Sequence, residues 1–317
     1  MCYICLIMKR KIGAHVSTAG GAEQAFARAS VIGCNCVQIF SGSPRVWAKK
    51  PLAQHDLKEI SSESHKYAVS PIYTHAIYLV NLVSDKPDLV KKSIQTLTYD
   101  LEFDALIGGG GVIVHLGSHQ GRGWLAVRDG LVKLIVELLK STPVKSRLLM
   151  ENSAGQQGKV CSDLTEIRWL LDMVSGVWQA QNFEKKHGQI KQRLGWCFDT
   201  CHAFATGYYL GHKPPKLEGQ SAMFEDRVVG SALQIITKLK LWSSLKMIHV
   251  NDSRDLFASG RDRHANLGEG RIDRADFKYF LNQPQVRRIP LVLEVPGEGK
   301  KGPNKINVDR LKLWAGD

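Results

Sequence analysis

The feature that most constrains the fold is an alternation of short apolar runs with amphipathic segments along nearly the whole chain. The apolar runs, each interpreted as a buried strand, cover residues 11–16, 36–40, 71–75, 112–115, 147–151, 195–199, 246–251 and 290–294. Helical periodicity separates them at 19–32, 57–67, 88–107, 124–140, 162–173, 223–239 and 273–282. Eight strand–helix units predict an α/β protein built as a (β/α)8 TIM barrel. The alternative is a doubly wound open sheet, which is disfavoured because no glycine-rich dinucleotide turn follows the first strand.

Composition narrows the class of protein and its partners. The net charge of +13 favours a polyanionic partner such as nucleic acid, although a merely basic surface explains the charge equally well. Seven cysteines without framework-like spacing indicate free thiols in a reducing compartment. No apolar run is long enough to span a membrane, so we expect no membrane partner. We expect one domain over 1–317, with Met8 as a candidate start that makes 1–8 a dispensable lead-in.

Ionisable side chains stand at or just beyond the ends of six consecutive predicted strands. They are His75, His115, Glu151, Asp199, His202, His249, Asp262, His264 and Glu294. Strand ends converge on one pocket in such barrels. Any one of these residues has an ordinary explanation as an ion pair or a hydrogen-bonded histidine. Gathered together, the carboxylates would repel one another unless divalent cations neutralised them. Mixed histidine and carboxylate ligation suits zinc or manganese, and this number of ligands suits three ions with one bridging carboxylate.

Several stretches carry a specific resemblance over nearly the whole chain. They include 12–15 (IGAH), 74–82 (THAIYLVNL), 114–119 (VHLGSH), 151–156 (ENSAGQ), 198–208 (FDTCHAFATGY), 249–253 (HVNDS), 262–270 (DRHANLGEG) and 293–299 (LEVPGEG). With these motifs the chain resembles the endonuclease IV family of zinc-dependent apurinic/apyrimidinic endonucleases. The resemblance implies that the first zinc is held by His75, His115 and Glu151, the second by Glu151, Asp199, His249 and Glu294, and the third by His202, Asp262 and His264.

The resemblance also implies a function. The expected enzyme is a hydrolase of base excision repair that cleaves the phosphodiester 5′ to abasic sites in duplex DNA and trims blocked 3′ ends. Closely spaced metals would make hydroxide available near neutral pH, and Glu151, as the bridging catalytic residue, would help position it. We expect three zinc ions, with manganese as an alternative at one or more sites. The protein is expected to be a monomer, either cytoplasmic and nucleoid-associated or, in a eukaryote, nuclear or mitochondrial.

An abasic nucleotide lies within the helical stack, so the enzyme needs a wedge. The resemblance assigns that role to Tyr78 and Leu79, with Arg45 also entering the duplex. Ordinary packing at the base of a loop is the alternative for the tyrosine and leucine. Arg263 and the pair Lys300-Lys301 are candidate phosphate contacts, and for the lysines a plain solvated surface explains their presence equally well.

The chain departs from the family pattern in two places. Residues 175–193 are predicted to form an inserted loop on the barrel face opposite the metals, and Ala76 and Val80 make the wedge motif less polar than expected. Two rival functions are a sugar isomerase or epimerase on the same barrel and a non-catalytic DNA-binding module. The first needs only one or two metals and the second needs none, so metal content distinguishes them.

Overall fold

The eight predicted strands form a closed parallel barrel. The structure is a computed structural model that describes residues 9–215 and 228–317. Strand neighbours run in the order β1-β12-β9-β6-β5-β4-β3-β2, and every pair in the barrel is parallel. The strands are β1 (Ile12–His15), β2 (Cys36–Phe40), β3 (Ile72–His75), β4 (Val112–Val114), β5 (Leu148–Glu151), β6 (Leu194–Asp199), β9 (Leu245–His249) and β12 (Leu291–Leu293). The predicted TIM barrel is confirmed.

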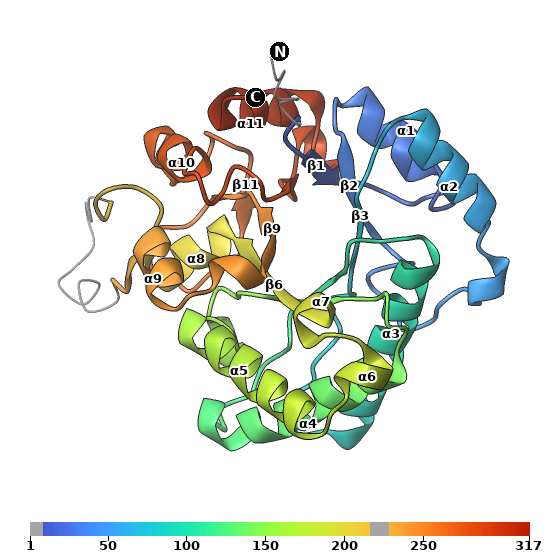
Figure 1. The fold of residues 1–317 in the computed structure, drawn as a ribbon. Helices are drawn as coiled ribbons and strands as arrows, with labels where there is room; N and C mark the ends of the chain where they lie inside the picture. The colour runs from blue at the N-terminus through green and yellow to red at the C-terminus, as the bar shows by residue number, and fades with distance from the viewer. Residues whose placement is uncertain (1–8, 216–227) are drawn as a thin grey trace, which may run out of the picture.

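Helices form an outer ring around this barrel (Figure 1). They are α1 (Gln24–Val31), α2 (Leu57–Lys66), α3 (Pro87–Leu106), α4 (Trp124–Ser141), α5 (Leu164–Ala180), α9 (Ala232–Lys238), α10 (Arg274–Leu281) and α11 (Lys305–Ala315). Each lays an apolar stripe on the strands. In α5, for example, Ile167, Leu170, Val174 and Trp178 recur at helical spacing and are all fully buried. No helix of the two described ranges is long and apolar enough to cross a membrane.

The interior of the barrel is closed by one apolar layer, to which seven strands each contribute a side chain. These residues are Cys36, Tyr73, Ile113, Leu149, Cys197, Met247 and Val292. On β1 the corresponding residue is Gly13, where a Cβ atom would lie only 2.4 Å from the carbonyl oxygen of Cys36. Because side chains two residues apart point to the same side of a strand, the next inward layer consists of the residues two positions further toward the carboxyl ends of the strands. The barrel therefore supplies a dry base beneath its carboxyl-terminal mouth.

Several elements differ from the prediction. The helix expected from residue 162 is capped by Asp163, whose side chain accepts from the amide of Thr165. The helix expected at 223–239 starts only at Ala232, and residues 223–227 lie outside the described residues, as does the expected lead-in 1–8. Unpredicted elements are α8 (Thr200–Thr206), the carboxyl-terminal helix α11 (Lys305–Ala315), the short strands β7 (Tyr208–Tyr209), β8 (Gly230–Ser231), β10 (Asp252–Ser253) and β11 (His264–Ala265), and 3-10 turns at Leu52–Gln54, Gln156–Gly158, Trp242–Ser244 and Glu298–Lys300.

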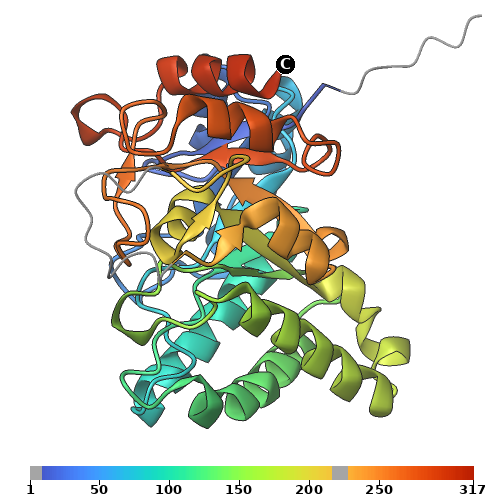
Figure 2. The ribbon, with the colours of Figure 1, turned by 90° about the vertical axis from the view of Figure 1, so that its left-hand side faces the viewer.

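The prediction of a loop at 175–193 is wrong, because most of this segment is helical. Helix α5 continues to Ala180, and α6 (Glu184–His187) and α7 (Ile190–Arg193) follow it. Trp178 is buried and donates from Nε1 to the carbonyl of Gly188 at 2.9 Å. Arg193 is also buried and donates to the carbonyls of Ser146 and Leu139. The segment precedes β6 and therefore lies at the amino-terminal end of the barrel, as Figure 2 shows for the yellow-green helices at its right.

Candidate metal centre

The layer above the apolar base is polar on all eight strands. It contains His15, Gln38, His75, His115, Glu151, Asp199, His249 and Glu294, each two residues beyond the member of the apolar layer on its own strand or, for His15, beyond Gly13. Six of these eight are predicted ligands. The parallel strands therefore bring together predicted ligands that are up to 219 residues apart in the sequence, the separation of His75 and Glu294.

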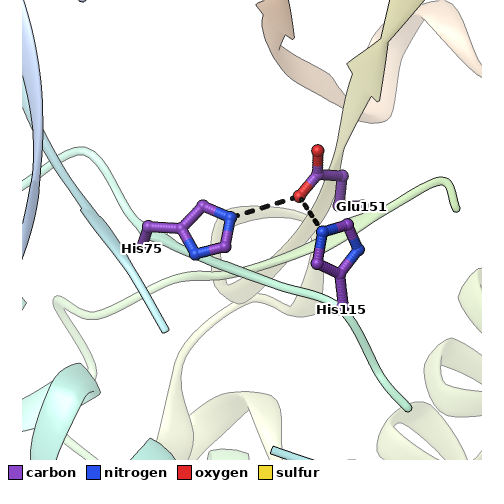
Figure 3. Close-up of side chains that lie close together, drawn as sticks. All are labelled: His75, His115 and Glu151. Carbon is purple, nitrogen blue, oxygen red and sulfur yellow. Dashed lines mark hydrogen bonds and ion pairs between the residues drawn. The ribbon is translucent and has the colours of Figure 1, made fainter. Parts of the chain in front are cut away.

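The first predicted group is assembled around one oxygen of Glu151 (Figure 3). The Oε2 atom lies 3.3 Å from Nε2 of His75 and 3.3 Å from Nε2 of His115. Glu151 and His75 are buried, whereas His115 is partly exposed toward the cavity. Ligand atoms of these three residues all lie within 4.8 Å of one another, which is close enough to share a metal ion.

The other oxygen of Glu151 belongs to the second group. Its Oε1 atom lies 2.8 Å from Nδ1 of His249, which in turn lies 3.3 Å from Oε2 of Glu294 and 3.9 Å from Oδ2 of Asp199. All four residues form one group with ligand atoms within 4.8 Å of one another. Glu151 therefore faces both groups, one oxygen to each, as a bridging carboxylate would.

The third group comes from the segments that follow β6 and β9. Asp199 caps α8 by accepting from the amide of His202 at 2.8 Å, so the first turn of α8 presents the His202 ring to the pocket. Oδ1 of Asp262 lies 3.1 Å from Nε2 of His202 and 3.4 Å from Nε2 of His264. The structure thus brings together all nine predicted ligands in the three predicted groups.

Hydrogen bonds leave one nitrogen of most of these imidazoles free to bind a metal. Nδ1 of His75 lies 2.6 Å from the carbonyl of Ala76, and Nδ1 of His202 lies 2.9 Å from the carbonyl of Asn152. A carbonyl only accepts, so these Nδ1 atoms carry the proton and Nε2 offers its lone pair. Within the described residues, the buried Nε2 atoms of His202 and His264 make no well-aligned hydrogen bond and face the carboxylate of Asp262. The donor set and these orphaned nitrogens fit divalent metal ions such as zinc.

The shifted pKa values of these ionisable groups also fit a site for cations. Burial raises the pKa of Glu151, but the imidazoles of His115 and His249 outweigh it and hold the pKa well below its ordinary value. Burial lowers the pKa of His115 to about 4. Burial also opposes the charge on His202, but Asp199 and Asp262 outweigh it and raise the pKa to about 10. In a metal-free pocket, positively charged imidazolium groups thus balance the negative charge of the carboxylates. When metal ions bind, they supply this positive charge instead, and the imidazoles release their protons.

The centre opens into a cavity of about 1020 Å³, lined by six of the predicted ligands and by Tyr78 and Lys300 among others. Tyr78 is 67% exposed and packs edge-on against Phe40 at 5.5 Å between ring centroids. Leu79 is 37% exposed, so both proposed wedge residues project from the loop after β3. Neither Arg45 nor Arg263 is among the described residues that line the cavity.

Arg45 is exposed, and Arg263 pairs with Asp255 through two hydrogen bonds, one of them 2.7 Å from Nε to Oδ2. The guanidinium of Arg263 is therefore already occupied, although its side chain is 51% exposed.

Sequence reasoning missed the two polar residues that β1 and β2 contribute to this layer. His15 lies 3.4 Å from Oε1 of Glu294 through its Nδ1, and Gln38 donates to the same oxygen at 2.6 Å. A partial signal was available, because His15 ends β1, whereas Gln38 lies in the middle of β2, two residues before its end at Phe40. Glutamine is not a usual metal ligand, and His15 stands in a sequence motif without a second candidate ligand beside it.

The fold and site together define a (β/α)8 barrel with a cluster of histidines and carboxylates, able to hold metal ions, at the carboxyl ends of its strands. A family model described as a xylose isomerase-like TIM barrel matches residues 26–314. The probable endonuclease 4 of Halothermothrix orenii is 32% identical over 288 residues, covering 90% of this chain and 93% of the relative. That of Methanoculleus marisnigri is 32% identical over 306 residues, covering 96% and 99%.

A solved structure gives the same result. The crystal structure of endonuclease IV from Thermus thermophilus is 28% identical, covers 96% of this chain and 98% of its own, and superposes with a TM-score of 0.74. The chain belongs to the endonuclease IV family, and it is a hydrolase of the apurinic/apyrimidinic endonuclease type.

Proposed function

We propose that the protein cleaves the phosphodiester 5′ to abasic sites in duplex DNA through a cluster of three zinc ions, and that it also trims blocked 3′ ends. The observation that carries this proposal is the sharing of Glu151 between two groups of ligands, with a third group beside them in the same cavity. A sugar isomerase needs one or two metals and an acid–base pair free of metal. Here every predicted carboxylate and imidazole belongs to a metal-capable group.

The residues that would hold the metals are those predicted from the sequence. His75, His115 and Glu151 would hold one ion, Asp199, His249 and Glu294 with Glu151 the second, and His202, Asp262 and His264 the third. Bound ions would supply hydroxide near neutral pH and neutralise the charge of the phosphate and of the leaving oxygen. Zinc suits this donor set, and manganese remains the alternative at one or more positions.

The remaining roles fall to the protein's own residues. Buried Glu151 would fix the position of the attacking group, because its two oxygens are held among imidazoles of four different segments. Tyr78 and Leu79 project beside the cavity and would enter the duplex at the lesion, and exposed Arg45 would assist them. The basic chain, with a net charge of +13, would hold the DNA backbone.

The product ends test this proposal. A duplex with one abasic analogue, labelled on the damaged strand, should be cut once on the 5′ side of the lesion, leaving a 3′-hydroxyl and a 5′-deoxyribose phosphate. A second duplex with a 3′-phosphoglycolate end should be converted to a 3′-hydroxyl end. An undamaged duplex of the same sequence is the control. Cutting on the 3′ side of the lesion, or equal cutting of the undamaged duplex, would contradict the proposal.

A further inference from the structure

Two strands carry no proposed ligand in the polar layer, namely β1 and β2. The residue on β2 is Gln38, which is fully buried beneath the metal centre. The six other strands of the barrel place a proposed ligand at the corresponding position. A glutamine in this layer therefore raises the question of what its amide does there.

The amide of Gln38 touches two proposed ligands of the same group. Its Nε2 lies 2.6 Å from Oε1 of Glu294 and 2.8 Å from Nδ1 of His15, and its Oε1 lies 2.7 Å from Nε2 of His249. An ionised carboxylate only accepts hydrogen bonds, so the amide nitrogen must face Glu294. The reverse orientation would bring two oxygens to 2.6 Å with no proton between them.

This orientation fixes the proton on His249. Because the amide oxygen of Gln38 only accepts, Nε2 of His249 always carries a proton. Nδ1, which lies 2.8 Å from Oε1 of Glu151 and 3.3 Å from Oε2 of Glu294, is therefore the nitrogen that can bind a metal once its own proton is released. At the same time, Gln38 occupies Oε1 of Glu294 and leaves its Oε2 turned to the centre.

We propose that Gln38 is a positioning residue for the metal bound by Glu151, Asp199, His249 and Glu294. It sets the tautomer of His249 and presents one oxygen of Glu294. The inference rests on the proposed metal centre. The competing explanation is that Gln38 only satisfies buried polar groups, in which case its loss lowers stability without weakening one metal site in particular.

The test measures zinc affinity site by site. Parent protein, Gln38→Met and a control variant are stripped of metal and equilibrated with zinc over a range of buffered free concentrations. The control is Thr142→Val, which also loses buried hydrogen bonds, to the carbonyl of Leu138 at 2.8 Å and from Arg193 at 3.1 Å, but at the end of α4. Gln38→Met keeps the length of the side chain and removes both of its hydrogen-bonding ends.

The expected result is that Gln38→Met weakens one of three zinc sites by about 10–100-fold, which is the usual effect of losing a partner that orients a ligand. The two other sites and all sites of Thr142→Val should match the parent. Gln38→Asn, which keeps the amide but is too short to reach its three partners, should show the same selective loss. It also serves if Gln38→Met fails to fold.

The outcomes separate the two proposals. A parent that binds fewer than three zinc ions contradicts the metal centre itself. A parent that binds three, with Gln38→Met and Gln38→Asn unchanged or weakened equally at all sites, overturns the role of Gln38 and leaves the centre intact. Unfolding of both Gln38 variants makes Gln38 a core residue and also overturns the inference.

Discussion

Replacing Glu151 by glutamine tests the bridge at the middle of the centre. Glu151 is fully buried, with Oε2 3.3 Å from His75 and His115 and Oε1 2.8 Å from His249 and 3.5 Å from His202. Glutamine has nearly the same shape, but it removes one negative charge from two metal sites and replaces one ligand oxygen by an NH2 group. The fold should survive, because a buried carboxylate is replaced by a neutral group.

The expected loss of incision is at least about 1000-fold, which corresponds to about 4 kcal/mol of transition-state stabilisation. The assay is single-turnover incision of a duplex with one abasic analogue, with zinc content and affinity for the same duplex measured in parallel. Zinc content should fall and binding of damaged duplex should remain. The matched control is Glu166→Gln on α5, a partly buried carboxylate that accepts from the amide of Cys161 at 2.6 Å outside the centre. Activity of Glu151→Gln within a few-fold of this control would refute the bridging role.

Three further predictions concern the DNA and the core. Replacing Tyr78 and Leu79 together by alanine should weaken binding of abasic duplex by at most a few kcal/mol, about the cost of extruding a nucleotide, with zinc content unchanged; unaltered affinity would return them to loop packing. Neutralising Arg45 should lower the log–log salt slope of DNA binding by about one. Replacing Lys185, Lys186 and Lys191, which lie at the amino-terminal end of the barrel, should leave the slope unchanged. A lower slope in this triple variant, with no change on neutralising Arg45, would contradict the placement of the DNA at the carboxyl-terminal mouth. Burial raises the pKa of Asp104 to about 7, so the folded state retains a proton that the unfolded state releases, and stability should fall as pH rises from about 4 to 7. Denaturant unfolding at several pH values should show that the free energy of unfolding falls less in Asp104→Asn than in the parent. An identical fall in both proteins would contradict the raised pKa of Asp104.

Six of the nine candidate ligands could be predicted from the sequence because their positions follow from strand geometry. An apolar run that ends in histidine or a carboxylate marks a position, and closure of the parallel barrel brings such positions together. Glu151 and Glu294 are far apart in the sequence, yet β5 and β12 carry them into the same layer. The local sequence pattern was sufficient for these residues because, on every strand of such a barrel, functional side chains stand at the carboxyl end.

The remainder depends on tertiary contacts that local pattern does not report. The extension of α5 was missed because Ser175 and Gly176 follow Met173 and the stretch beyond Trp178 is rich in lysine and glutamine. Trp178 is nevertheless buried and donates to the carbonyl of Gly188, ten residues further on. The pairing of Arg263 with Asp255 was missed because it joins two residues of a loop without regular periodicity. The hydrogen bonds of Gln38 span β1, β9 and β12, which no window of sequence contains.

The most direct test of a trinuclear zinc centre is a zinc titration of the metal-stripped protein, with incision of abasic duplex as the readout. A trinuclear centre should give no incision without metal, and activity should rise until it saturates at about three zinc ions per chain. Incision by the metal-free protein, or saturation at one ion per chain, would contradict a trinuclear centre built on Glu151.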